Sequence, residues 1–382
     1  MFCCFATTSK GLEELLATEL ANLGAVEIVT ANAGVQFNAD MSTIMKANLH
    51  SRLASRIMLQ LVYSGYRNEK DIYNVVSKVN WSEWFSVTST IKVATNAIRC
   101  PLKSLDFVTL TVKDAICDSF VKISGSRPSV GKIDPDMRIY NFLTENTVNV
   151  YLDTSGEGLF KRGYRHSKLD APIKENLAAG LIQLANWDSN TPFYDPMCGS
   201  GTIVAEAVSL GLNLAPGLNR HFAFEKFDNF MSAKWQELKS QAKNAIKYDR
   251  KLNIYANDIN NKAVEITKSN FEQLGILDYV KFDTGDFLSK KAPETNGTLI
   301  TNPPYGIRQD EQDELTLFYP KLGDHLKSYY ANWNCYFFTA DLRLAKLIRL
   351  KPSKRAVLYN GSLECRLFEF KMVARKHHTD LE

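Results

Sequence analysis

The segment from Phe193 to Leu210 constrains the fold of this chain more than any other stretch. A short strand-like segment, 193–195, leads into Pro196-Met197-Cys198-Gly199-Ser200-Gly201-Thr202, and the apolar run 203–210 follows. Glycines in a strand-to-helix turn let the backbone approach a ligand closely, and the helix N-terminus adds unpaired N–H groups. The sequence therefore predicts an α/β domain with a nucleotide-type cradle after this strand.

The glycine pattern differs from that of dinucleotide-binding proteins. Gly199 and Gly201 match the first two glycines of the dinucleotide fingerprint, but Val204 occupies the third position. Asp195 would also face an anionic pyrophosphate poorly, whereas it suits a zwitterion that carries a positive ammonium group. A nucleotide-dependent oxidoreductase is therefore disfavoured.

A second constrained segment is Asn302-Pro303-Pro304-Tyr305-Gly306, which follows the apolar, β-prone residues 299–301. Proline has no N–H for a sheet ladder, so the strand must end there, and Pro303 restricts Asn302 to an extended backbone. An amide, a constrained backbone and an aromatic ring then lie together, which suits a site for a planar group carrying an exocyclic amine. A surface turn is the alternative, because Asn, Pro and Gly are common turn residues.

Together the two segments resemble motifs of Rossmann-like methyltransferases that use S-adenosylmethionine (SAM). Asp-Pro-x-Cys-Gly-Ser-Gly-Thr is similar to their first cofactor motif, and Asn-Pro-Pro-Tyr is similar to the catalytic motif of those that methylate amino groups. The resemblance implies SAM as the cofactor. The catalytic residues that it implies are Asn302, Pro303, Pro304 and Tyr305. The cofactor contacts that it implies in these segments are Asp195, Pro196, Cys198, Gly199, Ser200, Gly201, Thr202 and Asn302.

Two acidic residues between these motifs fall where the methyltransferase fold places further cofactor contacts. Asp258 ends a strand-like segment beside Ile259, and we expect its carboxylate to accept from both ribose hydroxyls. Asp286 ends the next strand-like segment and is expected to accept from the adenine amine, while Phe287 packs on the ring. Either aspartate alone is more typical of a turn or helix cap. Their order between the two motifs favours the cofactor role.

The N-terminal residues have the pattern of two small α+β modules. Strand-like segments at 2–6, 26–30, 34–38 and 55–63 alternate with helical segments ending near 23 and 51, which predicts a ferredoxin-like module over residues 1–65. A helix at 71–79, a strand at 90–95, a helix at 106–123 and strands at 137–143 and 147–152 follow. Residues 91–95 and 150–156 resemble the THUMP domain, a module that binds structured RNA in RNA-modifying enzymes. We therefore expect a THUMP domain over 66–156.

The methyltransferase domain is expected over residues 157–382. Its further predicted helices are 174–185, 203–210, 232–248, 312–331 and 341–349, and its last predicted strands are 333–339, 355–360 and 364–373. Asn360-Gly361-Ser362 between the final two strands predicts a hairpin. The insertion at 213–252 lengthens the distance to Asp258, and composition does not indicate its role. The expected fold class is thus α/β plus α+β.

The charge balance sets a condition on any RNA partner. Lys and Arg number 46 and Asp and Glu 42, a net charge of +4, so nucleic acid would have to bind a local patch. Arg162, Tyr164 and Arg165 belong to a dense cationic and aromatic stretch at the expected domain junction. The candidate RNA contacts are Lys92, Arg99, Lys103, Arg162, Tyr164 and Arg165. Scattered solvated charges are the alternative for each of them.

The seven cysteines are scattered and form no C-x-x-C pattern, so neither a disulfide framework nor a metal site is expected. No apolar run approaches the ~20 residues that a membrane span needs. We expect a soluble, cytoplasmic protein, and the sequence does not indicate its oligomeric state.

The resemblance extends over nearly the whole chain, to the bacterial 23S ribosomal RNA guanine N2-methyltransferases. It implies SAM-dependent methylation of the exocyclic N2 amine of a guanine in RNA, with ribosomal RNA as the expected partner. Three alternatives stay open: adenine N6 methylation of DNA, guanine N2 methylation of transfer RNA, and a non-catalytic RNA-binding assembly factor. The N-terminal modules disfavour DNA, and the intact Asp195, Asp258, Asp286 and Asn302 disfavour a factor without turnover.

Overall fold

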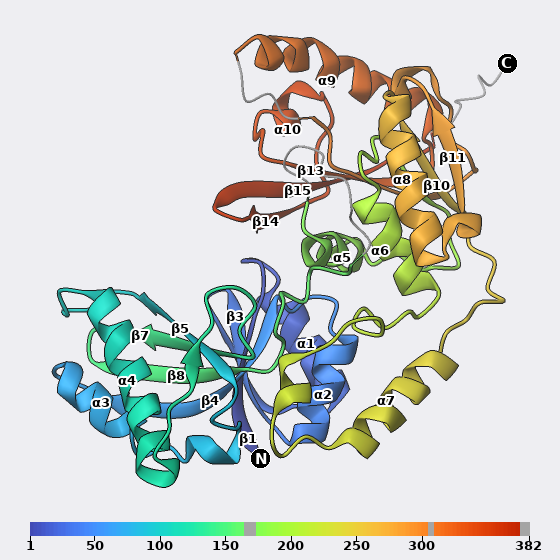
Figure 1. Cartoon of the computed structure of the whole chain (residues 1–382). Helices are drawn as coiled ribbons and strands as arrows, with labels where there is room; N and C mark the ends of the chain where they lie inside the picture. Colours follow the sequence, from blue (N-terminus) through green and yellow to red (C-terminus); the bar gives the residue numbers. More distant parts are fainter. Residues whose placement is uncertain (164–172, 305–308, 375–382) are drawn as a thin grey trace, which may run out of the picture. The chain divides into compact units, whose positions relative to one another are not determined.

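The computed structural model describes residues 1–163, 173–304 and 309–374, and this part of the chain contains two β-sheets, one of eight strands and one of seven (Figure 1). The N-terminal unit comprises Met1–Thr8, Leu16–Leu159 and Gly217–Ala242. The C-terminal unit comprises Ser9–Leu15, Phe160–Pro216 and Lys243–Glu382.

The first half of the eight-stranded sheet has ferredoxin-like topology. Strands β1 (Phe2–Thr7), β2 (Val26–Ala31), β3 (Gly34–Ala39) and β4 (Arg56–Gly65) lie in the order β2-β3-β1-β4, with antiparallel pairing throughout. Helices α1 (Glu13–Leu23) and α2 (Met41–His50) connect them. The α2 helix begins where the Asp40 carboxylate accepts the Thr43 N–H at 2.7 Å. The predicted β-α-β-β-α-β order is confirmed.

The second half of this sheet continues from β4 without a break. Strand β8 (Thr147–Asp153) pairs antiparallel with β4, and β7 (Met137–Leu143), β5 (Thr90–Ala97) and the short β6 (Ser129–Val130) complete the order β4-β8-β7-β5-β6. Helices α3 (Glu69–Val76) and α4 (Leu105–Ser124) cover one face of these strands (Figure 1). Met137, Ile139 and Leu143 of β7 are buried, and the side chains between them alternate onto the opposite face.

Two differences from the predicted elements have local causes. The α3 helix begins two residues earlier than expected because the Asn68 side chain accepts the Asp71 N–H at 3.1 Å and caps the helix. The two-residue strand β6 was not predicted, because so short a segment carries no periodicity.

Part of the predicted insertion folds with the N-terminal unit. Helix α7 (Ser232–Asn244) places Trp235 against the rings of Phe222 and Phe224, with ring centroids 5.5 and 5.1 Å away. The Gly217 N–H donates to the Leu49 carbonyl at 2.9 Å, and Lys226 Nζ donates to Asp136 Oδ1 at 2.6 Å. Residues 217–242 therefore belong to the N-terminal unit although they fall inside the sequence expected to form the methyltransferase domain.

The seven-stranded sheet has Rossmann-like topology. Its strands are β9 (Phe193–Asp195), β10 (Ile254–Asp258), β11 (Val280–Thr284), β12 (Gly297–Thr301), β13 (Trp333–Thr339), β14 (Lys354–Asn360) and β15 (Leu363–Lys371). They lie in the order β11-β10-β9-β12-β13-β15-β14, and only β15 runs antiparallel to its neighbours. The predicted sheet, with its final hairpin turning at Gly361 (φ +66°), is confirmed.

The remaining helices are α5 (Glu175–Leu184), α6 (Thr202–Gly211), α8 (Asn261–Leu274), α9 (Gln309–Tyr329) and α10 (Leu344–Leu347). Short 3₁₀ turns occur at Trp81–Glu83, Ala223–Lys226, Leu277–Tyr279 and Phe287–Ser289. Tyr319, Leu322 and Leu326 of α9 pack with Trp333 and Phe337 of β13 in one buried cluster. The α10 helix is shorter than the predicted 341–349 because Asp341 binds the Arg343 N–H in a turn at 3.0 Å.

Candidate active site

The carboxyl ends of four parallel strands place the predicted cofactor residues at one edge of the seven-stranded sheet. The glycine turn follows β9, Asp258 ends β10, Asp286 follows β11 and Asn302 follows β12. The chain crosses from β9 outward to β10 and β11 on one side, and to β12 and β13 on the other. Ligands of such open α/β sheets bind outside the strand ends where this order reverses. The topology therefore brings the sequence-predicted residues to one location.

The glycine turn depends on two residues with left-handed backbone. Gly199 has φ +55° and Gly201 has φ +76°. A Cβ on Gly201 would lie 2.3 Å from Thr267 Cγ2, so the turn packs directly on α8. A Cβ on Gly199 would meet no described atom within 4 Å, so the backbone there faces open space. This is the arrangement expected where a backbone must come close to a ligand.

Asp258 links the glycine turn to the end of β10. One carboxylate oxygen accepts the Gly199 N–H at 2.9 Å, and the other accepts the Asn260 N–H at 2.9 Å. The side chain is half-buried, and each oxygen keeps acceptor capacity. The next residue, Ile259, is 70% exposed. An oriented carboxylate therefore stands beside an open apolar side chain.

Asn257 is a residue of this site that sequence reasoning missed. Its buried amide Nδ2 donates to the Pro196 carbonyl at 3.0 Å and to the Gly285 carbonyl at 2.9 Å. It thereby ties the loops after β9 and β11 to the end of β10. The only signal in the sequence was an amide next to Asp258, which is too common a pairing to indicate this role.

Asp195 is buried at the end of β9. Its Oδ1 accepts the Thr301 hydroxyl at 2.7 Å and the Met197 N–H at 3.2 Å. Burial, with a smaller effect from the nearby charge of Asp258, raises the pKa of this carboxyl to about 7, against the opposing effect of the two hydrogen bonds. A positive group bound near Asp195 would favour its ionised form.

Asn302 contains an unsatisfied polar atom. Its Oδ1 is buried and has no hydrogen-bond partner among the residues that the structure describes. Leaving a buried acceptor unpaired costs about 1–3 kcal/mol. Pro303 is buried and Pro304 is exposed, whereas Tyr305 lies outside the described residues. Asn302 therefore presents an acceptor that a ligand N–H could satisfy.

The loop after β11 carries the two residues expected to contact the adenine. Asp286 is exposed, and its Oδ1 accepts the Leu288 N–H at 2.9 Å, so it is accessible to a ligand. Phe287, in contrast, is 3% exposed and packs against Tyr330, with centroids 5.4 Å apart, and against His325, at 5.2 Å. Little of the Phe287 ring is exposed in this cofactor-free structure, so its packing on the adenine stays a prediction.

The other residues of the first motif are mostly interior. Cys198, Ser200 and Thr202 are buried, and burial raises the pKa of the Cys198 thiol well above its usual range. A thiol held in its neutral form is a poor nucleophile, so Cys198 fills space beneath the turn. Pro196 is also buried, and only its carbonyl takes part in the contacts described above.

The predicted RNA contacts separate into three groups. Arg162 forms a buried ion pair with Glu206, with Nε and Oε1 3.2 Å apart, so little of its guanidinium is exposed, and its contact with RNA stays a prediction. Tyr164 and Arg165 lie outside the described residues. Lys92, Arg99 and Lys103 are exposed, and Lys92 lines a hollow of about 260 Å³ together with Lys113 and Lys132.

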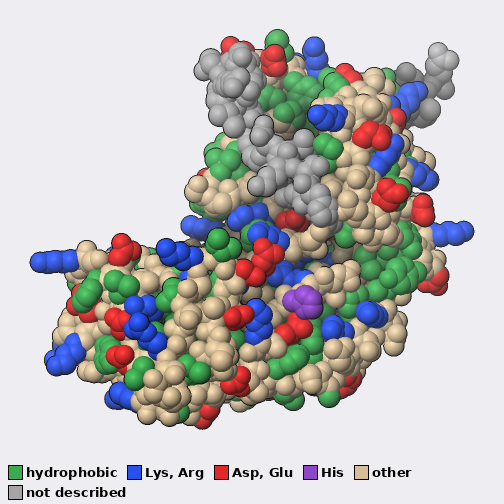
Figure 2. All heavy atoms as spheres, viewed as in Figure 1, with side chains coloured by type: hydrophobic (Ala, Val, Ile, Leu, Met, Phe, Trp, Pro, Cys, Tyr) green, Lys and Arg blue, Asp and Glu red, His purple; other side chains and the backbone are tan. Residues whose placement is uncertain are grey.

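Charges are mixed over the visible surface of the N-terminal unit. Figure 2 shows Lys and Arg side chains interspersed with Asp and Glu on this face. No group of three His, Cys, Asp or Glu within the described ranges is placed to hold a metal ion. Across the same ranges, no helix has the length and apolar character needed to cross a membrane.

Three family models match successive parts of the chain. Residues 3–58 match a model described as the RlmL ferredoxin-like domain, and residues 66–153 match the THUMP domain. Residues 162–369 match a model described as an RMKL-like methyltransferase domain. The matches confirm the order of module types predicted from the sequence.

Several solved structures are similar over almost their whole length. SMU.472, described as a candidate methyltransferase and solved in complex with S-adenosylhomocysteine (SAH), is 32% identical with a TM-score of 0.90, and the match covers 98% of this chain and 99% of that one. A "possible methylase" from Clostridium difficile 630 is also 32% identical, with a TM-score of 0.90 and coverage of 99% and 100%.

Two further structures add to this comparison. A protein described as a "predicted N6-adenine-specific DNA methylase", from Listeria monocytogenes, is 30% identical with a TM-score of 0.89 and coverage of 97% and 96%. TrmN from Thermus thermophilus is 18% identical with a TM-score of 0.72 and coverage of 98% and 100%, a likeness in fold.

Proposed function

Because this chain belongs to the RMKL-like methyltransferase family, carries RlmL-type ferredoxin-like and THUMP modules and uses SAM, we propose that it methylates the exocyclic N2 amine of a guanine in RNA. We propose 23S ribosomal RNA as the substrate. The buried, unpaired Oδ1 of Asn302 at the end of β12 carries the proposal that an exocyclic amine is methylated, and the match to the THUMP domain favours RNA as the substrate.

The residues at the strand ends fit SAM. The open backbone at Gly199, the carboxylate of Asp258 and the exposed Asp286 offer contacts for the amino acid, ribose and adenine parts, respectively. The exposed Ile259 offers an apolar surface for the cofactor next to Asp258. Asp195 favours a positive ammonium nearby. When bound, SAM supplies a methyl group on a positive sulfonium, a strong electrophile.

The protein's task in this reaction is to position a weak nucleophile. The lone pair of a guanine amine is delocalised into the ring, so its two hydrogens must be held to orient it. Asn302 Oδ1 accepts one hydrogen, and the Pro303 carbonyl is proposed to accept the other. Holding two reactants in line is worth up to about 7–11 kcal/mol of the barrier. Acceptors aimed at the nitrogen also stabilise the positive charge that develops there.

The N-terminal modules support RNA as the substrate class. A THUMP domain is a module of RNA-modifying enzymes, and here it forms one continuous sheet with the ferredoxin-like module. A target base inside a helix would have to be flipped out, at a cost of a few kcal/mol. Tyr305, the remaining residue of the catalytic motif, is proposed to stack on that base.

A second candidate function is N6 methylation of adenine in DNA. It is favoured by the description of the Listeria monocytogenes protein, which is 30% identical to this chain. An exocyclic amine on a planar ring is common to both substrates, so the Asn302 geometry serves either one.

Nucleoside mass spectrometry of cells lacking the gene separates the two candidates. The proposal predicts that N2-methylguanosine falls in ribosomal RNA of these cells and returns when the wild-type gene is restored. A change confined to N6-methyladenine in DNA would contradict it and favour the second candidate.

A further inference from the structure

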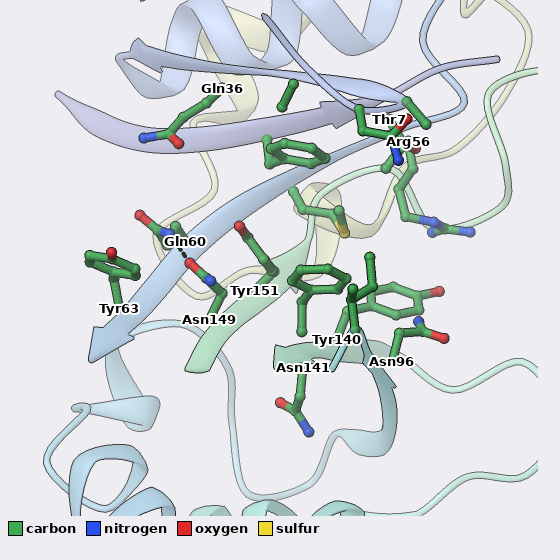
Figure 3. A pocket seen from close by; sticks show the side chains of 17 residues that line it. Thr7, Gln36, Arg56, Gln60, Tyr63, Asn96, Tyr140, Asn141, Asn149 and Tyr151 are labelled. Carbon is green, nitrogen blue, oxygen red and sulfur yellow. Dashed lines mark hydrogen bonds between the residues drawn. The ribbon is translucent and has the colours of Figure 1, made fainter. Parts of the chain in front are cut away.

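The face of the eight-stranded sheet opposite its helices is hollowed. Alternate side chains of β1, β3, β4, β5, β7 and β8 point into a cavity of about 790 Å³, within the range of roughly 300–1,000 Å³ typical of ligand sites (Figure 3). Every residue lining it belongs to the N-terminal unit. The cavity is therefore separate from the candidate active site, and none of the roles described above uses it.

Aromatic rings form much of the floor of this cavity. Tyr140 and Tyr151 are directly paired across β7 and β8, and Phe142 is paired with Asn149 on the same strands. The ring of Tyr151 lies 6.0 Å from that of Phe5 on β1, between centroids. Tyr63, at the end of β4, is 69% exposed. Several ring faces are thus spread over neighbouring strands within one cavity.

Amide side chains lie between the rings. Gln60 Nε2 donates to Asn149 Oδ1 at 2.5 Å, so the bond uses the amide oxygen of Asn149 and not its nitrogen (Figure 3). Asn96, on β5, is exposed and is paired in register with Phe142 of β7. Asn141 points away from the cavity and donates to Thr95 Oγ1 at 3.1 Å, so it serves the interior. Amides can both donate and accept, which suits the edges of nucleobases.

The cavity carries little net charge. Arg56 is the cation among its described lining residues, and none of these residues is Asp or Glu. Its guanidinium is bound to the buried Asp153 and to the Gly156 carbonyl, the latter at 2.6 Å, and it lies over the Tyr140 ring at 5.1 Å. The arginine charge is therefore matched within the sheet. A ligand held here is recognised by ring faces and amide edges and not by phosphate charge.

We propose that this sheet face, which we call the open sheet face, binds unpaired bases of the RNA substrate. The proposal rests on RNA being the substrate. Bases stack on aromatic side chains and present their edges to amides only when they are not paired in a helix. A peptide that extends a sheet would instead bind along an edge strand, here β2 or β6, and not across six strands. The chemistry of the lining therefore selects single-stranded RNA.

Binding of short fluorescent RNA to the full-length protein tests this assignment. The wild type is expected to bind a single strand more tightly than the duplex of the same sequence. Phe142→Leu and Tyr63→Ala, which remove rings from the open sheet face, should each weaken single-strand binding by roughly 5- to 150-fold. Phe142→Tyr, which keeps a ring, should restore it.

Phe107→Leu is the matched control. Phe107 is 55% exposed in the same unit but lies on α4, which covers the opposite face of the sheet. This variant should keep wild-type affinity, and all variants should keep wild-type SAM affinity. Unchanged single-strand affinity in both Phe142→Leu and Tyr63→Ala, or an equal loss in Phe107→Leu, would overturn the proposal.

The same variants distinguish this proposal from the proposed function. If the wild type forms N2-methylguanosine in RNA but the ring variants bind single strands normally, the open sheet face is wrongly assigned and the function stands. If the wild type methylates no RNA, the function fails, and the affinity of the ring variants for single strands still decides the assignment of the face.

Discussion

At the scale of single residues, the candidate active site contains groups that are unfavourable until a ligand arrives. Asp195 is a buried carboxyl whose pKa is raised to about 7, and Asn302 holds a buried acceptor without a described partner. Both features cost stability in the cofactor-free protein and are relieved by a positive group or an N–H donor. Stability is thus given up where binding has to occur.

Asp195→Asn is expected to stabilise the cofactor-free protein more at pH 8 than at pH 5. Because the folded pKa of Asp195 is raised, the native state holds a proton that the unfolded chain releases near pH 4. Stability is therefore lost as the pH rises from about 4 to about 7, by at most on the order of 4 kcal/mol. An asparagine keeps the neutral acceptor at every pH. Urea unfolding at the two pH values measures the difference.

SAM binding provides the counterpart of this stability measurement. The same variant should bind SAM more weakly than the wild type, because it lacks the negative charge opposite the ammonium. An equal change in unfolding free energy at pH 5 and pH 8 would show that Asp195 is not the titrating group.

Gly201→Ala should disrupt the glycine turn. The new Cβ would lie 2.3 Å from Thr267 Cγ2 and would also require a left-handed backbone, which together cost roughly 1–3 kcal/mol or more. Gly275→Ala is the control. Gly275 also has a left-handed backbone, with φ +67°, but a Cβ added there would meet no described atom within 4 Å. Thermal shift with and without SAM should show a larger loss of cofactor-induced stabilisation for Gly201→Ala. Equal losses in the two variants would contradict the packing argument.

At the scale of elements, local signals predicted most strands and helices, whereas contacts between distant segments did not follow from them. Strand β13 and the final hairpin appear where periodicity and Asn-Gly placed them. The burial of Phe287 did not follow from the sequence, because the rings that pack on it, His325 and Tyr330, come about forty residues later. The ion pair of Arg162 did not follow either, since its partner Glu206 lies more than forty residues later, on α6. Neither partner carries a sequence signal of the contact.

The packing of segment 217–242 on the N-terminal unit is another contact between distant segments that the sequence did not indicate, and it can be tested. Trp235 is buried against the rings of Phe222 and Phe224, so Trp235→Ala should lower the unfolding free energy of the N-terminal unit by about 3–5 kcal/mol. Met231→Ala, at an exposed position beside α7, should change it by less than about 0.5 kcal/mol. The SAM-dependent stabilisation should be the same in both variants. Similar unfolding free energies for Trp235→Ala and Met231→Ala would show that Trp235 does not hold segment 217–242 to the N-terminal unit.

At the scale of the whole molecule, the two units divide the proposed work. The seven-stranded sheet brings the glycine turn, Asp258, Asp286 and Asn302 to one edge, where SAM and the target amine would meet. The eight-stranded sheet offers a neutral, aromatic face for unpaired RNA. The sequence motifs predicted the first of these sites, because they lie at strand ends. The second depends on side chains from six strands and became visible only in the folded sheet.

Asn302 is proposed to direct methyl transfer to the N2 amine of guanine in RNA. The most direct measurement uses isotope-labelled SAM and RNA from cells lacking the gene, followed by digestion to nucleosides and mass spectrometry. The wild type should place the label in N2-methylguanosine. Asn302→Ala should lose this product by two orders of magnitude or more, about 3 kcal/mol or more of barrier, while its SAM affinity stays near wild type. Label in an adenine nucleoside, or undiminished turnover by Asn302→Ala, would contradict the claim.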